Sequence, residues 1–229
     1  MFSFFKIKNY KSQGIIESLV AITVVVVGLV SVLTLVVFNL RVQVYSHDML
    51  IATNLAKEGI EVVRSVRDTN WMNGDDWDQG LIITTGFIGQ EKGFLFLNTG
   101  AWNGYNSVYY QVLDNLACSW EDCVFGGDSV LGPTPARMYI VTKDNRTIYD
   151  QLGFLNPLES VATKFYRVVF INEICLNGSN QEHILTVYDQ HCEGSSEERI
   201  GLQIISKVGW NDKDTMRTVE AEEWIYNWR

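Results

Sequence analysis

Residues 11–41 read KSQGIIESLVAITVVVVGLVSVLTLVVFNLR. Between Lys11 and Arg41, Glu17 is the only ionisable side chain, and Leu19–Leu40 is a run of 22 uncharged, mostly apolar residues. A helix over this run is about 33 Å long, enough to cross a bilayer core of about 30 Å. A carboxylate at the head of such a helix costs about 2.5–3.5 kcal/mol to insert, so we interpret Glu17 as a functional residue that needs a partner.

The helical pattern continues beyond Arg41 but becomes amphipathic. Small and apolar residues recur at spacings of three and four from Ala52 to Val66, and charged residues lie opposite them. We therefore predict one helix over residues 13–67, with a transmembrane part at about 15–40 and an amphipathic part at about 41–67. The sequence Asp68-Thr69-Asn70 is expected to end it.

From residue 81 onward the signal changes to short β-rich runs separated by turn residues. The predicted strands are Leu81–Thr85, Gly93–Asn98, Val108–Leu113, Met138–Thr142, Lys164–Ile174, Ile184–Tyr188, Ile200–Trp210 and Met216–Tyr226. Alternation from Leu202 to Trp210 indicates a strand with one buried face. A helix followed by such strands predicts an α+β fold, with residues 68–229 forming one β-rich globular domain on an antiparallel sheet.

The N-terminal pattern resembles that of type IV prepilins and pseudopilins, which have a basic leader, a peptidase site at a small residue, and a hydrophobic helix with glutamate at the fifth mature position. Cleavage after Ser12 makes Gln13 the first mature residue and Glu17 the fifth. Cleavage after Gly14 would restore the family's usual glycine but would make Glu17 the third residue. We prefer the Ser12 site because the carboxylate position matters more to assembly. The continuation to Arg67 resembles minor pilins of the PilV type.

The resemblance implies a function as well as a fold. A prepilin peptidase would remove the leader, residues 1–12, and methylate the new amine of Gln13. Glu17 would then pair with the amino terminus of a neighbouring pilin subunit in a helical fibre, built on an inner-membrane assembly platform. The resemblance thus implies a minor pilin of a cell-surface pilus or its tip, with a long helix laid across a sheet.

Two alternatives share much of this pattern. A pseudopilin of a type II secretion or DNA-uptake machine has the same helix and differs in its partners. A singly membrane-anchored extracellular binding domain would retain residues 1–12 and would be indifferent to the identity of residue 17.

Charge indicates which side of the membrane the domain occupies. The chain has a formal net charge of -9, and loss of the three lysines of the leader would leave -12. So acidic a chain is a poor nucleic-acid binder, because phosphate affinity depends on clustered Lys and Arg. Lysines before the apolar run and acids after it predict a cytoplasmic N-terminus, and hence a single-pass membrane protein before assembly and an extracellular domain.

The four cysteines, Cys118, Cys123, Cys175 and Cys192, are expected to be oxidised outside the cytoplasm. Three pairings are possible, and local order favours Cys118 with Cys123 and Cys175 with Cys192. A zinc site that uses these cysteines with His183 or His191 is the rival interpretation, but the spacing matches no tight finger pattern.

Other chemistry finds little support in the sequence. The acidic loop Asp75, Asp76 and Asp78 raises the question of calcium, but it lacks the full loop signature, so a solvated turn is favoured. The sequence contains no phosphate-binding glycine loop, no nucleophile elbow and no His-Glu-x-x-His motif. We therefore expect no enzymatic activity, no metal and no cofactor.

Overall fold

The structure is a computed structural model that describes residues 13–82, 93–94, 96–97, 109–110, 136–143, 146–151, 160–185, 192, 197–213 and 215–227. The chain divides into two compact units, Met1–Asp48 and Met49–Arg229. The first unit holds the apolar first half of the one described helix, α1, and the second holds the rest of α1 and all the described strands.

Helix α1 (Gln13–Asn73) is longer at its C-terminus than the predicted end at residue 67. A Schellman motif ends it, because Gly74 adopts a positive φ of 81°. The Gly74 N–H donates to the Trp71 carbonyl at 3.3 Å, and the Asp75 N–H donates to the Asn70 carbonyl at 3.0 Å. The Asn-Gly pair at 73–74 therefore ends the helix, and the polar residues 68–70 do not.

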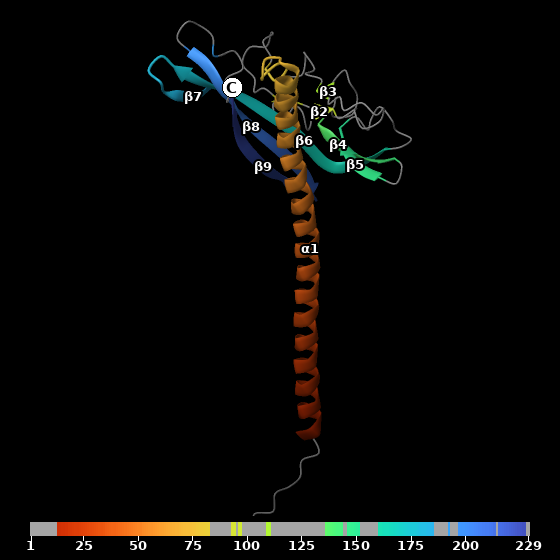
Figure 1. The fold of residues 1–229 in the computed structure, drawn as a ribbon. Helices are drawn as coiled ribbons and strands as arrows, with labels where there is room; N and C mark the ends of the chain where they lie inside the picture. Colours follow the sequence, from red (N-terminus) through yellow and green to blue (C-terminus); the bar gives the residue numbers. More distant parts are fainter. Residues whose placement is uncertain are drawn as a thin grey trace, which may run out of the picture. The chain divides into compact units, whose positions relative to one another are not determined.

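The strands form an antiparallel arrangement that confirms the predicted α+β class (Figure 1). They are β1 (Gly93–Phe94), β2 (Phe96–Leu97), β3 (Tyr109–Tyr110), β4 (Arg137–Lys143), β5 (Arg146–Asp150), β6 (Ser160–Asn177), β7 (Glu182–Leu185), β8 (Glu197–Asp212) and β9 (Thr215–Tyr226). Among the described strands, seven make one sheet with the path β5-β4-β6-β8-β9, and β1 and β7 also pair with β6. Strands β2 and β3 form a separate pair.

The central strand of the sheet is β6. Strand β6 pairs with β8 from Phe165 to Asn177. It also pairs with β4, β1 and β7, which contact successive parts of β6 along its length. Every predicted strand except the first overlaps a strand of the structure. The exception is wrong over Leu81 and Ile82, which form no strand because the Leu81 N–H closes a turn onto the Asp78 carbonyl at 2.9 Å. Strand β5 was not predicted.

The C-terminal half of α1 lies against one face of this sheet, and two apolar clusters fill the space between them (Figure 1). One cluster contains Ile60, Val63, Val66, Trp77, Leu81, Val169, Ile171, Leu202, Ile204 and Ile225, and the other contains Ala52, Leu55, Ala56, Met138, Phe165, Val208 and Trp210. The predicted alternation of β8 is confirmed, because Leu202, Ile204, Val208 and Trp210 are all buried toward the helix. Burial of this apolar surface is the main force that joins helix and sheet.

Gly59 marks the closest approach of α1 to the sheet. A Cβ built on Gly59 would collide with Ser206 Oγ, and would lie 3.1 Å from Val169 Cγ2 and 3.2 Å from Ser206 Cβ. The neighbouring small residues Ala52 and Ala56 are fully buried on the same side of the helix. Small side chains therefore set the distance between helix and sheet, as the amphipathic pattern of this segment suggested.

A buried arginine also connects the helix with β6. Arg167 is only 3% exposed, and its guanidinium lies 3.2 Å from Glu58 Oε2 and donates to the Leu55 carbonyl at 3.3 Å. It also contacts Gln151 Oε1 at 3.4 Å. Burial lowers the pKa of Arg167, while the carboxylates of Glu58 and Asp150 oppose that effect. The cation is thus held between helix and sheet by groups from both.

We predict that Gly59→Val destabilises the globular unit by about 1–3 kcal/mol, because the added carbons overpack the contact with Ser206 and Val169. Tryptophan fluorescence during denaturant unfolding of the full chain in detergent measures this change. Gly28→Val is the matched control, since a Cβ at Gly28 meets nothing within 4 Å. Equal unfolding midpoints for the two variants would show that the close approach does not constrain the fold.

We also predict that Glu58→Gln lowers the free energy of unfolding by about 1–3 kcal/mol, because it removes the ion-pair partner of a buried cation. The same unfolding measurement applies. Glu61→Gln, one turn further along α1, changes only a surface pair with Arg64 and is expected to cost within about 0.5 kcal/mol. A loss at Glu58 no larger than that at Glu61 contradicts the role assigned to the ion pair between Glu58 and the buried Arg167.

Candidate functional site

The first half of α1 is apolar on all of its faces. Every described side chain from Gly14 to His47 is exposed, and Ile15, Leu19 and Leu33 are 72%, 64% and 63% exposed. Within the described part of the chain, α1 is the one helix that is long and apolar enough to cross a membrane by length and composition. Such a surface suits a membrane anchor or a signal segment, because in water it would be a large uncovered apolar patch.

From Gly14 to Leu40 the hydroxyl groups of α1 are bonded inside the helix. Ser18, Thr23, Ser31 and Thr34 each donate to the carbonyl oxygen four residues earlier, at 2.8 Å in every case. A hydroxyl bonded in this way needs no partner from water or from another chain. The segment can therefore enter an apolar environment without leaving these polar groups unpaired.

Glu17 is the only ionisable residue of α1 between Gly14 and Leu40. Its side chain is exposed on the second turn of α1, and no cation lies within ion-pair distance of it among the described residues. In an apolar environment an ionised carboxylate without a partner is costly. Gln13 is the first residue of α1, one turn before Glu17. Ser12 lies outside the described residues, so cleavage between Ser12 and Gln13, and methylation of Gln13, stay predictions.

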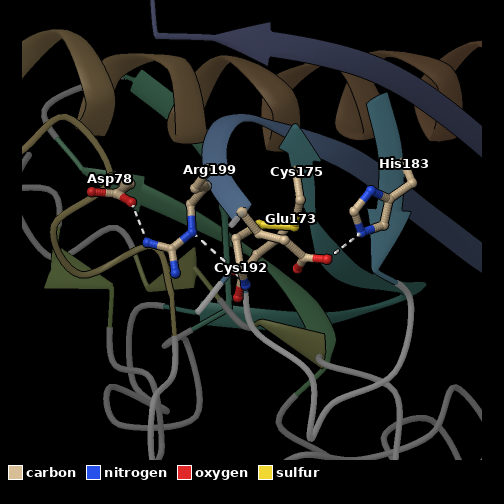
Figure 2. Close-up of a disulfide and its surroundings, with 7 residues drawn as sticks. Asp78, Glu173, Cys175, His183, Cys192 and Arg199 are labelled. Carbon is tan, nitrogen blue, oxygen red and sulfur yellow. Dashed lines mark hydrogen bonds and ion pairs between the residues drawn. A yellow bond between two sulfur atoms is a disulfide. The ribbon is translucent and has the colours of Figure 1, made fainter. Parts of the chain in front are cut away.

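A disulfide joins Cys175 on β6 to Cys192, with the Cα atoms 5.6 Å apart (Figure 2). This bond agrees with the pairing that local order favoured. The other expected pair, Cys118 with Cys123, lies outside the described residues. Disulfides persist in oxidising compartments, so the bond points to an extracytoplasmic location for this unit.

Beside the disulfide, Arg199 bridges two carboxylates from different parts of the chain (Figure 2). Its Nη1 lies 2.7 Å from Asp78 Oδ2, and its Nε lies 2.9 Å from Glu173 Oε2, a carboxylate that is 1% exposed. The Cys192 N–H also donates to Glu173 Oε2, at 3.1 Å. Burial lowers the pKa of Arg199, but the two carboxylates outweigh it and raise the pKa above its ordinary value. The network ties the loop after α1 to β6, β8 and the disulfide.

Several side chains that the sequence suggested as metal ligands make other interactions in the structure. Asp78 is paired with Arg199 and so is not part of a joint site with Asp75 and Asp76. Cys175 and Cys192 are bonded to each other (Figure 2). His183 Nε2 lies 3.8 Å from Glu197 Oε1. His183 and Glu197 gather around the Cys175 sulfur, but that sulfur is committed to the disulfide. His191 lies outside the described residues.

Sequence reasoning missed the network around Arg199 because its members come from three distant segments. One local signal was present: Glu173 lies in the mostly apolar stretch Val168–Leu176 of β6, and a carboxylate there must be paired if it is buried. The identity of the partner could not be read from that signal.

Comparison with known proteins gives no assignment: no family model, no curated protein and no solved structure matches the chain. The architecture itself is pilin-like, since a long N-terminal helix with an apolar first half packs its second half on an antiparallel sheet. That architecture and the chemistry around Glu17 are the basis for a functional proposal.

We predict that Cys175→Ser lowers the free energy of unfolding by about 3 kcal/mol, because the disulfide closes a loop between residues 17 apart. Denaturant unfolding of the full chain in detergent, with and without a reducing agent, measures the loss. In the reducing agent the parent and the variant should be equally stable, since any other disulfide is then broken in both. A variant as stable as the unreduced parent would show that this bond contributes nothing to the fold.

Proposed function

We propose that the chain is a minor type IV pilin, processed by a prepilin peptidase and assembled through its N-terminal helix into a cell-surface pilus or its tip. The observation that carries the proposal is the exposed apolar half of α1 with a single carboxylate, Glu17, near its start. In this proposal the helix first anchors the chain in the membrane and then packs among the helices of other subunits.

Glu17 has a defined physical role in this function. When α1 leaves the membrane for a fibre core, its carboxylate remains in apolar surroundings and needs a cation there. The amine freed by cleavage before Gln13 is a cation with the same requirement. Pairing Glu17 of one subunit with the Gln13 amine of a neighbour cancels both charges and fixes the axial register of the two helices.

The second unit supports the same proposal through its disulfide. The Cys175–Cys192 bond suits an oxidising compartment, as expected for a domain carried outside the cytoplasm. The proposed partners are the prepilin peptidase, other pilin subunits and an inner-membrane assembly platform. In this account the domain acts by binding and position, without catalysis.

We predict that Glu17→Ala leaves the protein cleaved and membrane-inserted but lowers its content in sheared fibres by about tenfold or more, since a change of about 1.4 kcal/mol already shifts an equilibrium tenfold. Immunoblots of sheared-fibre and membrane fractions from the native host measure both pools. Glu61→Ala is the matched control, because it removes a carboxylate from the same helix outside the apolar segment.

The outcomes separate the alternatives. Equal incorporation of Glu17→Ala and the parent contradicts the role of Glu17. A parent protein that is cleaved but enters a short fibre dependent on a secretion or uptake machine identifies a pseudopilin. A parent protein found only in membranes, with residues 1–12 retained, identifies a singly anchored domain and overturns the proposal.

A further inference from the structure

Strand β9 forms one end of the main sheet. Within the described part of the chain it pairs with β8 alone, from Thr215 to Tyr226, while β5 forms the opposite end (Figure 1). An edge strand of this length presents backbone donors and acceptors that can accept a further strand. The side chains of β9 determine which side chains an added strand needs.

The side chains of β9 are markedly acidic near its C-terminal end, and two of these acids, Glu220 and Glu222, are exposed. Glu220, Glu222 and Glu223 lie within four residues. Two of them are matched by cations: Glu220 Oε1 lies 2.8 Å from Lys207 Nζ, and Glu223 is ion-paired with Arg64. Glu222 differs, because no cation of the described residues lies within ion-pair distance of it.

Two neutral donors hold the Glu222 carboxylate. Its Oε1 accepts hydrogen bonds from the Trp224 indole N–H at 2.7 Å and from Gln203 Nε2 at 2.6 Å. The indole N–H first, and the Gln203 amide second, lower the pKa of Glu222 below its ordinary value. Gln203 is in turn fixed by Asn172, whose Nδ2 donates to Gln203 Oε1 at 2.9 Å. The result is an ionised carboxylate in a fixed position on the surface.

An exposed aromatic ring lies next to this charge. Trp224 is 46% exposed. By contrast Trp210, the other described tryptophan of this sheet, is 1% exposed. Glu220, Glu222 and Trp224 alternate along β9 and so lie on the same face of the sheet, opposite α1. An indole face beside a carboxylate favours a lysine or arginine side chain, through charge and cation–π attraction together.

We propose that the β9 edge binds an extended segment of a partner protein, added as a further strand, whose lysine or arginine side chains contact Glu222 and Trp224. Main-chain hydrogen bonds to β9 supply affinity, and the period-two alternation of the added strand presents its cations to one face. The acidic side chains of β9 disfavour a second copy of the same chain, because like charges would face each other across the join. This inference does not depend on Glu17 or on fibre assembly.

The test uses the full chain in uncharged detergent and a short synthetic peptide of alternating lysine and threonine, with alternating glutamate and threonine as the control. Fluorescence anisotropy measures binding of the labelled peptides, and hydrogen–deuterium exchange with mass spectrometry locates it. We expect the lysine peptide alone to bind, to slow exchange in β9 but not in β5, and to bind more weakly as salt concentration rises.

Variants make the assignment specific. Glu222→Lys is expected to weaken binding of the lysine peptide by about tenfold or more, and Glu222→Gln, which preserves the side-chain shape, to weaken it several-fold. Glu198→Lys is the control, since it makes the same change in net charge at an exposed position of β8. The inference is overturned if the lysine peptide does not bind, if the glutamate peptide binds comparably, if protection appears outside β9, or if the variants at residues 222 and 198 have equal effects.

Discussion

The structure depends on one constraint: a single helix must satisfy two different environments along its length. From residue 14 to residue 47 the side chains of α1 are exposed and mostly apolar, whereas beyond residue 50 one side of the helix is buried against a sheet. The hydroxyl groups of Ser18, Thr23, Ser31 and Thr34 donate to carbonyl oxygens of the same helix, so they need no hydrogen-bond partner from water. Glu17 is then the charge that an apolar environment must accommodate, and the function we propose follows from that requirement.

The second half of α1 is fixed to the sheet by close packing and by charge. Gly59 allows the backbone to approach Ser206, and Arg167 connects the helix carboxylate of Glu58 with β6. At the end of the helix, Arg199 and the disulfide hold the following loop to β6 and β8. The sheet is therefore joined to the C-terminal half of α1 and to the loop after it at several separate points.

Much of this arrangement could be predicted from local patterns. The apolar run, the amphipathic continuation, the α+β class, the alternation of β8 and the Cys175–Cys192 pair each depend on neighbouring residues in the sequence. The polar residues 68–70 predict too early an end of α1, because the helix continues to the glycine at position 74 that caps it. The contacts of Arg167, Arg199 and Glu222 could not be predicted, because each joins residues that only the strand register and the helix–sheet packing bring together.

The central claim is that α1 is an assembly helix whose amino terminus is freed by cleavage of the leader. The identity of the first residue of the mature chain tests that claim most directly. Intact mass and N-terminal sequencing of the protein from its native host give this identity. The account predicts a chain that starts at Gln13, with or without a methyl group on its amine. A chain that starts at Met1, in a host with an active prepilin peptidase, would contradict it and leave a membrane-tethered domain.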